Sequence, residues 1–203
     1  MASNNQGMGQ RSNPSLPAFT ADGCLPPGDH VLTLAELRFS HLVTGPSDLA
    51  EDEDWDHEWR LHLVGQLEVL CGQLWTVGIE RIFIDGSFTE RIGHPNDIDG
   101  YFECDLYELG SGRLERALNK LDRFKVWTWS PDTRRPYRNY THKRQLPMWH
   151  RYRVELYPHF GHGPFSNIKD EHGHNLTFPS AFRRSRRTGE PRGIVRLESG
   201  APA

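Results

Sequence analysis

Apolar residues recur at helical spacing in three parts of the chain. The clearest case is 55–77, where apolar side chains fall three or four positions apart and Gly78 marks the end. A shorter helix should follow Thr33, because Thr33 as N-cap and Glu36 three residues later can form a capping box. The third segment is 106–124, in which the amphipathic repeat starts properly near Ser111. The predicted helices are 34–43, 55–77 and 106–124, the last with Leu114, Leu118 and Leu121 as its buried stripe.

Other segments show patterns that predict β-strands. The apolar residues of 80–85 indicate a mostly buried strand, which Gly86 and Ser87 end. The run DIDGYFEC places Asp97 and Asp99 two residues apart, so both side chains should project from the same side of a strand. The predicted strands are 80–85, 97–104, 126–130 and 151–157, with a long loop at 131–147.

The composition fits one globular domain with a lean core. The chain has 203 residues, of which 36% are hydrophobic and 11% aromatic. No apolar run approaches the roughly 18 residues of a membrane span, so we expect no membrane partner. Three widely spaced cysteines favour a reducing, cytoplasmic location. The predicted organisation is a disordered tail at 1–20, one domain at 21–197 and a C-terminal tail at 198–203.

The net charge of -3 conceals a strong asymmetry along the chain. Acids dominate 48–58, where there is no lysine or arginine, whereas 134–153 contains bases and no acid. The segment 182–197 adds six arginines against one glutamate. Two basic surfaces are therefore available to an anionic ligand, and the alternative for each is a solvated surface.

Two short motifs carry the candidate chemistry. The Gly86-Ser87 turn at the end of a strand offers unhindered backbone N–H groups and a hydroxyl to a triphosphate. The carboxylates of Asp97 and Asp99 suit Mg²⁺, which prefers oxygen ligands and shares them with nucleotide phosphates. Other interpretations stay open: Asp97 as a loop cap, Asp99 as an edge-strand acid paired with an arginine, and Ser87 as a helix N-cap.

The order of strand, Gly-Ser, loop and Asp-x-Asp resembles the signature of the nucleotidyltransferase superfamily with the polymerase-β type fold. Here the motif consists of Gly86-Ser87 followed by Asp97 and Asp99. The resemblance implies a third carboxylate from a later strand, for which Glu155 is the match. It further implies an α+β fold, with a small mixed β-sheet and helices packed on one side. The three acids would be catalytic and would bind Mg²⁺ or Mn²⁺, while the Gly-Ser turn would bind phosphates.

A second resemblance is to a poorly characterised group of small bacterial and phage nucleotidyltransferase-like proteins. The group's reaction is not established, so this resemblance implies a fold and a site rather than a substrate. Two residues depart from the superfamily pattern: Asp85 and Gly100 stand where apolar residues are more usual. The segments that carry the resemblance are 23–28, 84–88, 154–159 and 182–195, within 23–197.

Several basic residues are further candidates for phosphate binding. Arg91 follows the Gly-Ser turn closely, with a solvated loop arginine as the alternative. In the basic loop, Lys143 and Arg144 are the better phosphate candidates. Aromatic residues of that region, such as Trp149, suit base stacking or else belong to the core. The arginines of 183–187 could contact a triphosphate or an RNA acceptor.

The leading hypothesis for function is a Mg²⁺-dependent nucleotidyltransferase. It would move a nucleoside monophosphate from an NTP to an acceptor hydroxyl on RNA, a protein or a small molecule, and the resemblance suggests a toxin–antitoxin or phage-defence setting. The alternative is a catalytically inactive binding or antitoxin-like protein of the same fold. A third hypothesis is an RNA-binding module that uses the basic aromatic loop.

Overall fold

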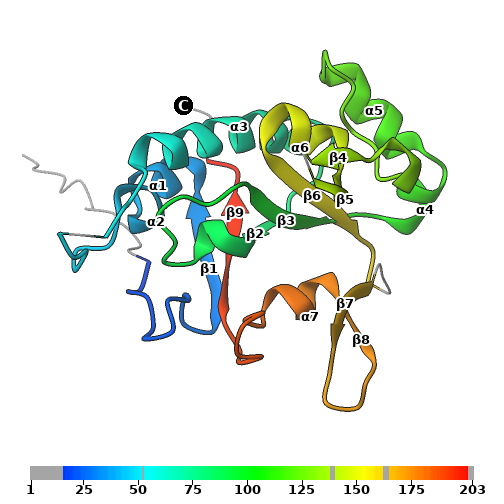
Figure 1. The fold of residues 1–203 in the computed structure, drawn as a ribbon. Coiled ribbons are helices and arrows are strands. Elements are labelled where there is room, and N and C mark those ends of the chain that lie inside the picture. The colour runs from blue at the N-terminus through cyan, green and yellow to red at the C-terminus, as the bar shows by residue number, and fades with distance from the viewer. Residues whose placement is uncertain (1–15, 52, 138–139, 162–164, 201–203) are drawn as a thin grey trace, which may run out of the picture.

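A five-stranded mixed sheet forms the centre of the protein (Figure 1). The computed structural model describes residues 16–51, 53–137, 140–161 and 165–200. The two outer strand pairs are parallel and the two inner pairs antiparallel, which confirms an α+β fold with a mixed sheet. In spatial order the strands are β1 (Gly28–Thr33), β9 (Gly193–Glu198), β2 (Ile82–Asp85), β3 (Ile98–Glu103) and β6 (Val154–His159).

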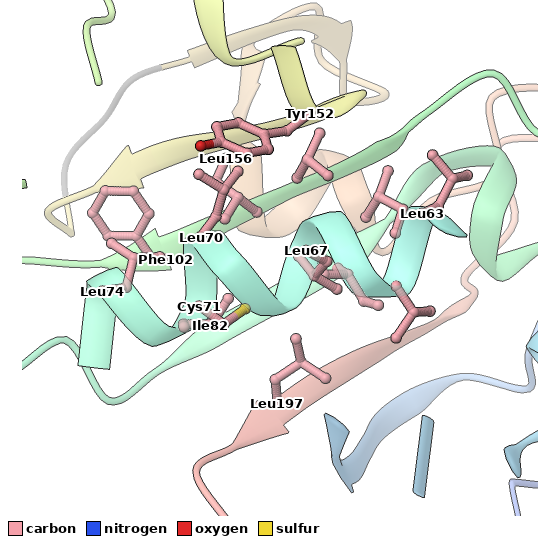
Figure 2. Packing of buried hydrophobic residues seen from close by; sticks show 14 of the residues in the cluster. Leu63, Leu67, Leu70, Cys71, Leu74, Ile82, Phe102, Tyr152, Leu156 and Leu197 are labelled. Carbon is pink, nitrogen blue, oxygen red and sulfur yellow. The ribbon is translucent and has the colours of Figure 1, made fainter. Parts of the chain in front are cut away.

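Helix α3 (His57–Thr76) packs its apolar side against one face of this sheet. Asp56 caps the helix by accepting the Trp59 N–H, and Gly78 follows its C-terminus with a φ of 85°. In Figure 2, the side chains of Leu63, Leu67, Leu70 and Leu74 lie beside Ile82, Phe102, Leu156 and Leu197 of the strands. The other helices associated with this core include α1 (Leu34–Phe39), α2 (His41–Thr44) and α6 (Pro147–Tyr152).

Helix α7 (Phe178–Phe182) is the exception and lies on the opposite face of the sheet (Figure 1). Its Phe182 joins a small cluster of buried side chains from the central strands, namely Phe83, Tyr101 and Ile194. Because strand side chains alternate, this second face is formed by the residues between those of the main core. The candidate acids lie on this same face.

Two short hairpins stand outside the five-stranded sheet. The first occupies the segment predicted as a loop at 131–147, so that prediction is wrong. After the 3-10 helix η2 (Pro131–Thr133), the chain forms β4 (Arg135–Tyr137) and β5 (Tyr140–Gln145). The second hairpin pairs β7 (Phe165–Lys169) with β8 (Asn175–Thr177).

Two predicted helices are each divided in the structure. The first breaks at Ser40 into α1 and α2, although the capping box of Thr33 and Glu36 is present as predicted. The segment 106–124 breaks near Gly112, which adopts a left-handed φ of 69°. Leu121 is 44% exposed and was wrongly assigned to the buried stripe. The resulting helices are α4 (Leu106–Gly110) and α5 (Arg113–Leu121).

Two strand predictions also need correction. The segment 126–130 is no strand, because the side chain of Asn119 takes the place of a partner strand by bonding both the N–H and the carbonyl of Trp127. In 151–157 the first two residues belong to α6. Arg153 then adopts a left-handed φ of 55°, and β6 begins at the next residue.

The folded region extends beyond the predicted domain start. Leu16 and Phe19 pack against the core, so the ordered chain begins before residue 21. The remainder of the predicted N-terminal tail, 1–15, lies outside the described residues, as does 201–203. Among the helices that the structure describes, none has the length and apolar character required to cross a bilayer.

Candidate functional site

Acidic side chains gather on the sheet face that α7 covers. Even-numbered residues of β2, β3 and β6 enter the main core, so the odd-numbered residues project to the other side. The strand register then places Asp85 beside Asp99, and Asp99 beside Glu155. Asp97 lies two residues before Asp99, just ahead of β3, and is 7% exposed. The three predicted carboxylates therefore share one face, as the spacing of Asp97 and Asp99 predicted.

Hydrogen bonds fix two of these carboxylates and leave the third without one. Oδ2 of Asp97 accepts a hydrogen bond from the indole of Trp149 at 2.5 Å. Glu155 accepts a backbone N–H at 2.7 Å on Oε1 and the hydroxyl of Tyr157 at 2.7 Å on Oε2. Within the described residues Asp99 has neither a hydrogen bond nor an ion pair, so its interpretation as an arginine-paired acid is wrong. Asp99 is the carboxylate that remains available to a ligand.

The surroundings of Asp99 raise its pKa to about 7. The largest cause is burial, and the negative charges of Asp97 and Glu155 add to it. Arg186 opposes the shift by favouring the ionised form, while Asp85 adds to it. A cation placed against this carboxylate would relieve the repulsion among the acids.

A cavity of about 420 Å³ opens above the acids. Its floor includes Asp97, Asp99 and Glu155, and positive charge enters from Arg134, Lys143 and Arg186. An aromatic wall completes the lining, and within it the rings of Tyr157 and Phe178 stack with centroids 5.0 Å apart. The cavity therefore combines metal-type ligands, cations and a flat apolar surface.

The Gly-Ser turn reaches this cavity through Ser87. It lies in the 3-10 helix η1 (Gly86–Thr89), where Gly86 has a left-handed φ of 78°. A Cβ on Gly86 would come within 3.0 Å of Oδ2 of Asp99, so glycine allows the turn to approach the acid closely. Ser87 lies inside η1 rather than at its N-cap, which corrects the capping interpretation. Its hydroxyl forms no hydrogen bond with a described residue and borders the cavity.

A second cavity of about 200 Å³ is lined by both residues of the turn. It shares Ser87 and Arg186 with the first cavity, so the two are adjacent. Gly86 and Ser185 contribute to its lining together with arginines from the C-terminal segment. These arginines are Arg184, Arg186, Arg187 and Arg192.

One of these arginines explains the unusual Asp85. Arg192 is buried and donates hydrogen bonds to the carboxylates of Asp85 and Glu90, so its charge is compensated inside the protein. Burial raises the pKa of the Asp85 carboxyl, and Arg192 opposes that shift. The other departure, Gly100, is also structural, because a side chain there would overlap the carbonyl of Phe83.

The predicted phosphate ligands differ in whether they line one of the two cavities. Lys143 lines the first cavity, as expected of a phosphate ligand. Arg91 lines neither cavity, since its guanidinium pairs with Asp48 at 3.0 Å and Glu53 at 2.7 Å in the acidic segment. Arg144 also lines neither, because it donates to a backbone carbonyl across the hairpin at 2.8 Å. The structure therefore brings only Lys143 of these three into the candidate site.

Most rings of the basic region belong to the core. Trp127, Trp149 and Tyr152 are at most 4% exposed, and the indole of Trp129 bonds a carbonyl of β6. They are not available to stack on nucleic-acid bases, which corrects that interpretation. The aromatic wall instead includes two residues that the sequence analysis did not single out. Tyr157 could have been found from its position two residues after Glu155, whereas no sequence signal marks Phe178.

The donor set fits a cation shared with a ligand better than a closed metal site. Across the described ranges, no group of three or more His, Cys, Asp or Glu side chains is arranged to hold a metal ion. Glu155 has a hydrogen bond on each oxygen, whereas Oδ1 of Asp97 and both oxygens of Asp99 accept none from described residues. Two carboxylates plus substrate phosphates are nevertheless the set that Mg²⁺ commonly takes.

The fold and this face define an α+β protein with carboxylates and arginines around two adjacent polar cavities. The chain belongs to the Family of unknown function (DUF6932), whose model matches residues 17–198. No curated protein and no solved structure matches the chain. The matched range includes the acids, the Gly-Ser turn and the arginines, so the candidate site lies in the part of the chain that matches the family.

Proposed function

We propose that the protein is a Mg²⁺-dependent nucleotidyltransferase, which moves a nucleoside monophosphate from an NTP to an acceptor hydroxyl. The observation that carries this proposal is that Ser87 lines both an acid-lined cavity and an arginine-lined cavity, and that Gly86 lines the second. A nucleotide triphosphate needs cations and N–H groups for its phosphates, and its metal needs carboxylates beside them. The two cavities supply these groups, and both are lined by Ser87 and Arg186.

Asp97 and Asp99 would hold Mg²⁺, with Mn²⁺ as the alternative ion. When bound, the ion would lower the cost of bringing phosphate oxygens next to the carboxylates and would stabilise charge in the transition state. Oδ1 of Asp97 and both oxygens of Asp99 accept no hydrogen bond from the described residues, so no protein hydrogen bond competes for them. Glu155 adds a third negative charge and is the candidate third ligand.

The chain's own groups would act by positioning and charge compensation. Ser87 would donate its hydroxyl to a phosphate, and the open backbone at Gly86 would let that phosphate approach. Arg184, Arg186 and Arg187 would offset the negative charge of the phosphates. Within the proposed mechanism no protein side chain forms a covalent bond with the nucleotide.

The test is transfer of label from each α-labelled NTP in the presence of Mg²⁺ and total RNA, lysate protein or small-molecule extract. We expect label transfer by the wild type and by Asp132→Asn, an exposed acid outside both cavities, and none by Asp99→Asn. Equal transfer by Asp99→Asn would refute the assigned site. Calorimetry showing NTP binding by a wild type that transfers nothing would instead support the catalytically inactive binding protein.

A further inference from the structure

The β4–β5 hairpin and the adjacent helix α6 carry positive charge that the protein does not compensate. Elsewhere, arginines such as Arg38, Arg91 and Arg183 form ion pairs with carboxylates. In the part of the chain that the structure describes, no carboxylate forms an ion pair with the bases of this region. These bases are Arg134, Arg135, Lys143, Arg144, Arg151 and Arg153, and Arg138 lies outside the described residues.

This basic surface is continuous with the acid-lined cavity. Arg135, Lys143 and Arg144 are exposed, and Lys143 also lines the cavity. Arg134 donates to the hydroxyl of Tyr157 at 3.2 Å, and that hydroxyl donates to Glu155. A chain of contacts therefore joins the exposed cations to the carboxylates where transfer would occur.

We propose that this hairpin binds the phosphates of a single-stranded nucleic acid, whose sugar hydroxyl is the acceptor in the transfer. The acceptor role rests on the proposed function, whereas the binding of nucleic acid by the hairpin does not. Arginine guanidiniums match phosphate oxygens, and the uncompensated cations of the hairpin favour a partner with repeated negative charge. A nucleic-acid strand supplies both these phosphates and a hydroxyl, which an acidic protein segment rich in Asp and Glu does not.

The transfer step balances with an NTP as the only other reactant. The hydroxyl oxygen of the strand forms a bond to the α-phosphorus, and the bond from that phosphorus to the bridging oxygen of pyrophosphate breaks. Pyrophosphate leaves with that electron pair, and the hydroxyl proton passes to solvent. The strand gains one nucleoside monophosphate, and no oxidant or reductant is required.

Binding can be measured without NTP or Mg²⁺, by the fluorescence anisotropy of labelled single-stranded RNA and DNA of one sequence at several salt concentrations. The test variant is Arg135→Gln with Lys143→Gln, since neither side chain forms an ion pair. The matched control is Lys120→Gln with Lys125→Gln, which removes the same charge from exposed positions outside both cavities. Each lost phosphate contact lowers the slope of log K against log salt by about 0.7 for a single strand, so the test variant should lose about 1.4.

The hairpin is supported as the binding surface if the wild type binds RNA, DNA or both tightly and only the test variant binds more weakly. Comparing the RNA and DNA measurements identifies which nucleic acid is bound. Equal binding of polyglutamate, equal weakening in the control variant, or no binding at low salt would overturn it. Label transferred to protein instead of the strand would overturn the acceptor role. If no transfer occurs while hairpin-dependent binding persists, the proposed enzyme fails and the binding surface stands.

Discussion

Replacing Asp99 with asparagine tests the meaning of the acid-lined cavity directly. The substitution keeps the size of the side chain and removes a charge that burial and neighbouring acids disfavour. We therefore expect Asp99→Asn without ligand to be more stable than the wild type at neutral and alkaline pH. An ordinary surface acid that pairs with an arginine would show the opposite effect.

The sign and size of the effect follow from the raised pKa. An Asp99 carboxyl with a pKa near 3.8 when unfolded and about 7 when folded destabilises the native state increasingly as the pH rises between those values. Since a tenfold change in proton affinity is worth about 1.4 kcal/mol, the advantage of the variant should grow by about 2.5 kcal/mol from about pH 5 to about pH 8. For a chain of this length that corresponds to roughly 5 to 10 °C in melting temperature.

Thermal melts over this pH range, with and without Mg²⁺ and NTP, measure both parts of the expectation. Ligand should raise the melting temperature of the wild type and of the control Asp132→Asn, and should leave Asp99→Asn unchanged. A variant less stable than the wild type at alkaline pH, or a difference that stays constant with pH, would refute the argument from charge repulsion. A wild type that does not respond to Mg²⁺ with NTP would refute the proposed ligand.

Two further substitutions test the Gly-Ser turn and the buried ion pair of Asp85 with Arg192. Gly86→Ala places a Cβ in a left-handed conformation 3.0 Å from Asp99, so we expect a loss of about 1–2 kcal/mol in the free energy of unfolding and a larger loss in NTP affinity. Unchanged NTP affinity by calorimetry would reject the phosphate-binding role. Arg192→Met leaves the buried Asp85 without its cation and should cost about 3–5 kcal/mol in chemical denaturation, most of it recovered in Asp85→Asn with Arg192→Met. Failure of the double variant to recover would contradict the assigned pairing.

The local spacing of apolar residues was sufficient to predict the elements whose buried side chains are mostly apolar. The helix from His57 and the strands β2 and β3 follow from apolar spacing, because most of their buried side chains are apolar and regularly placed. Strand β9 was not predicted, since its apolar residues follow a run of arginines that reads as a solvated segment. Its place between β1 and β2 depends on contacts with residues more than 100 positions away, which no local pattern contains.

The candidate site could be predicted only in part for the same reason. The shared side of Asp97 and Asp99 follows from strand geometry, whereas the position of Glu155 depends on β6 lying next to β3. Arg91 follows the turn closely in sequence, yet its guanidinium forms ion pairs with Asp48 and Glu53. Strand spacing placed Asp97 and Asp99 on one side of the sheet, but it could not show which cations had partners inside the fold.

Asp85 and Asp99 lie side by side in the strand register, yet only Asp85 forms an ion pair with a described residue. Asp85 has its own buried cation in Arg192, so it holds the Gly-Ser turn in place without any ligand. Asp99 stands between Asp85 and Glu155 in the register and has no ion pair with a described residue. Arg192 shows that this face of the sheet can provide an acid with a cation, and a partly buried carboxylate without an ion pair costs stability. Such a cost is expected where a bound cation supplies the missing charge, which is the strongest physical argument for reading this face as a functional site.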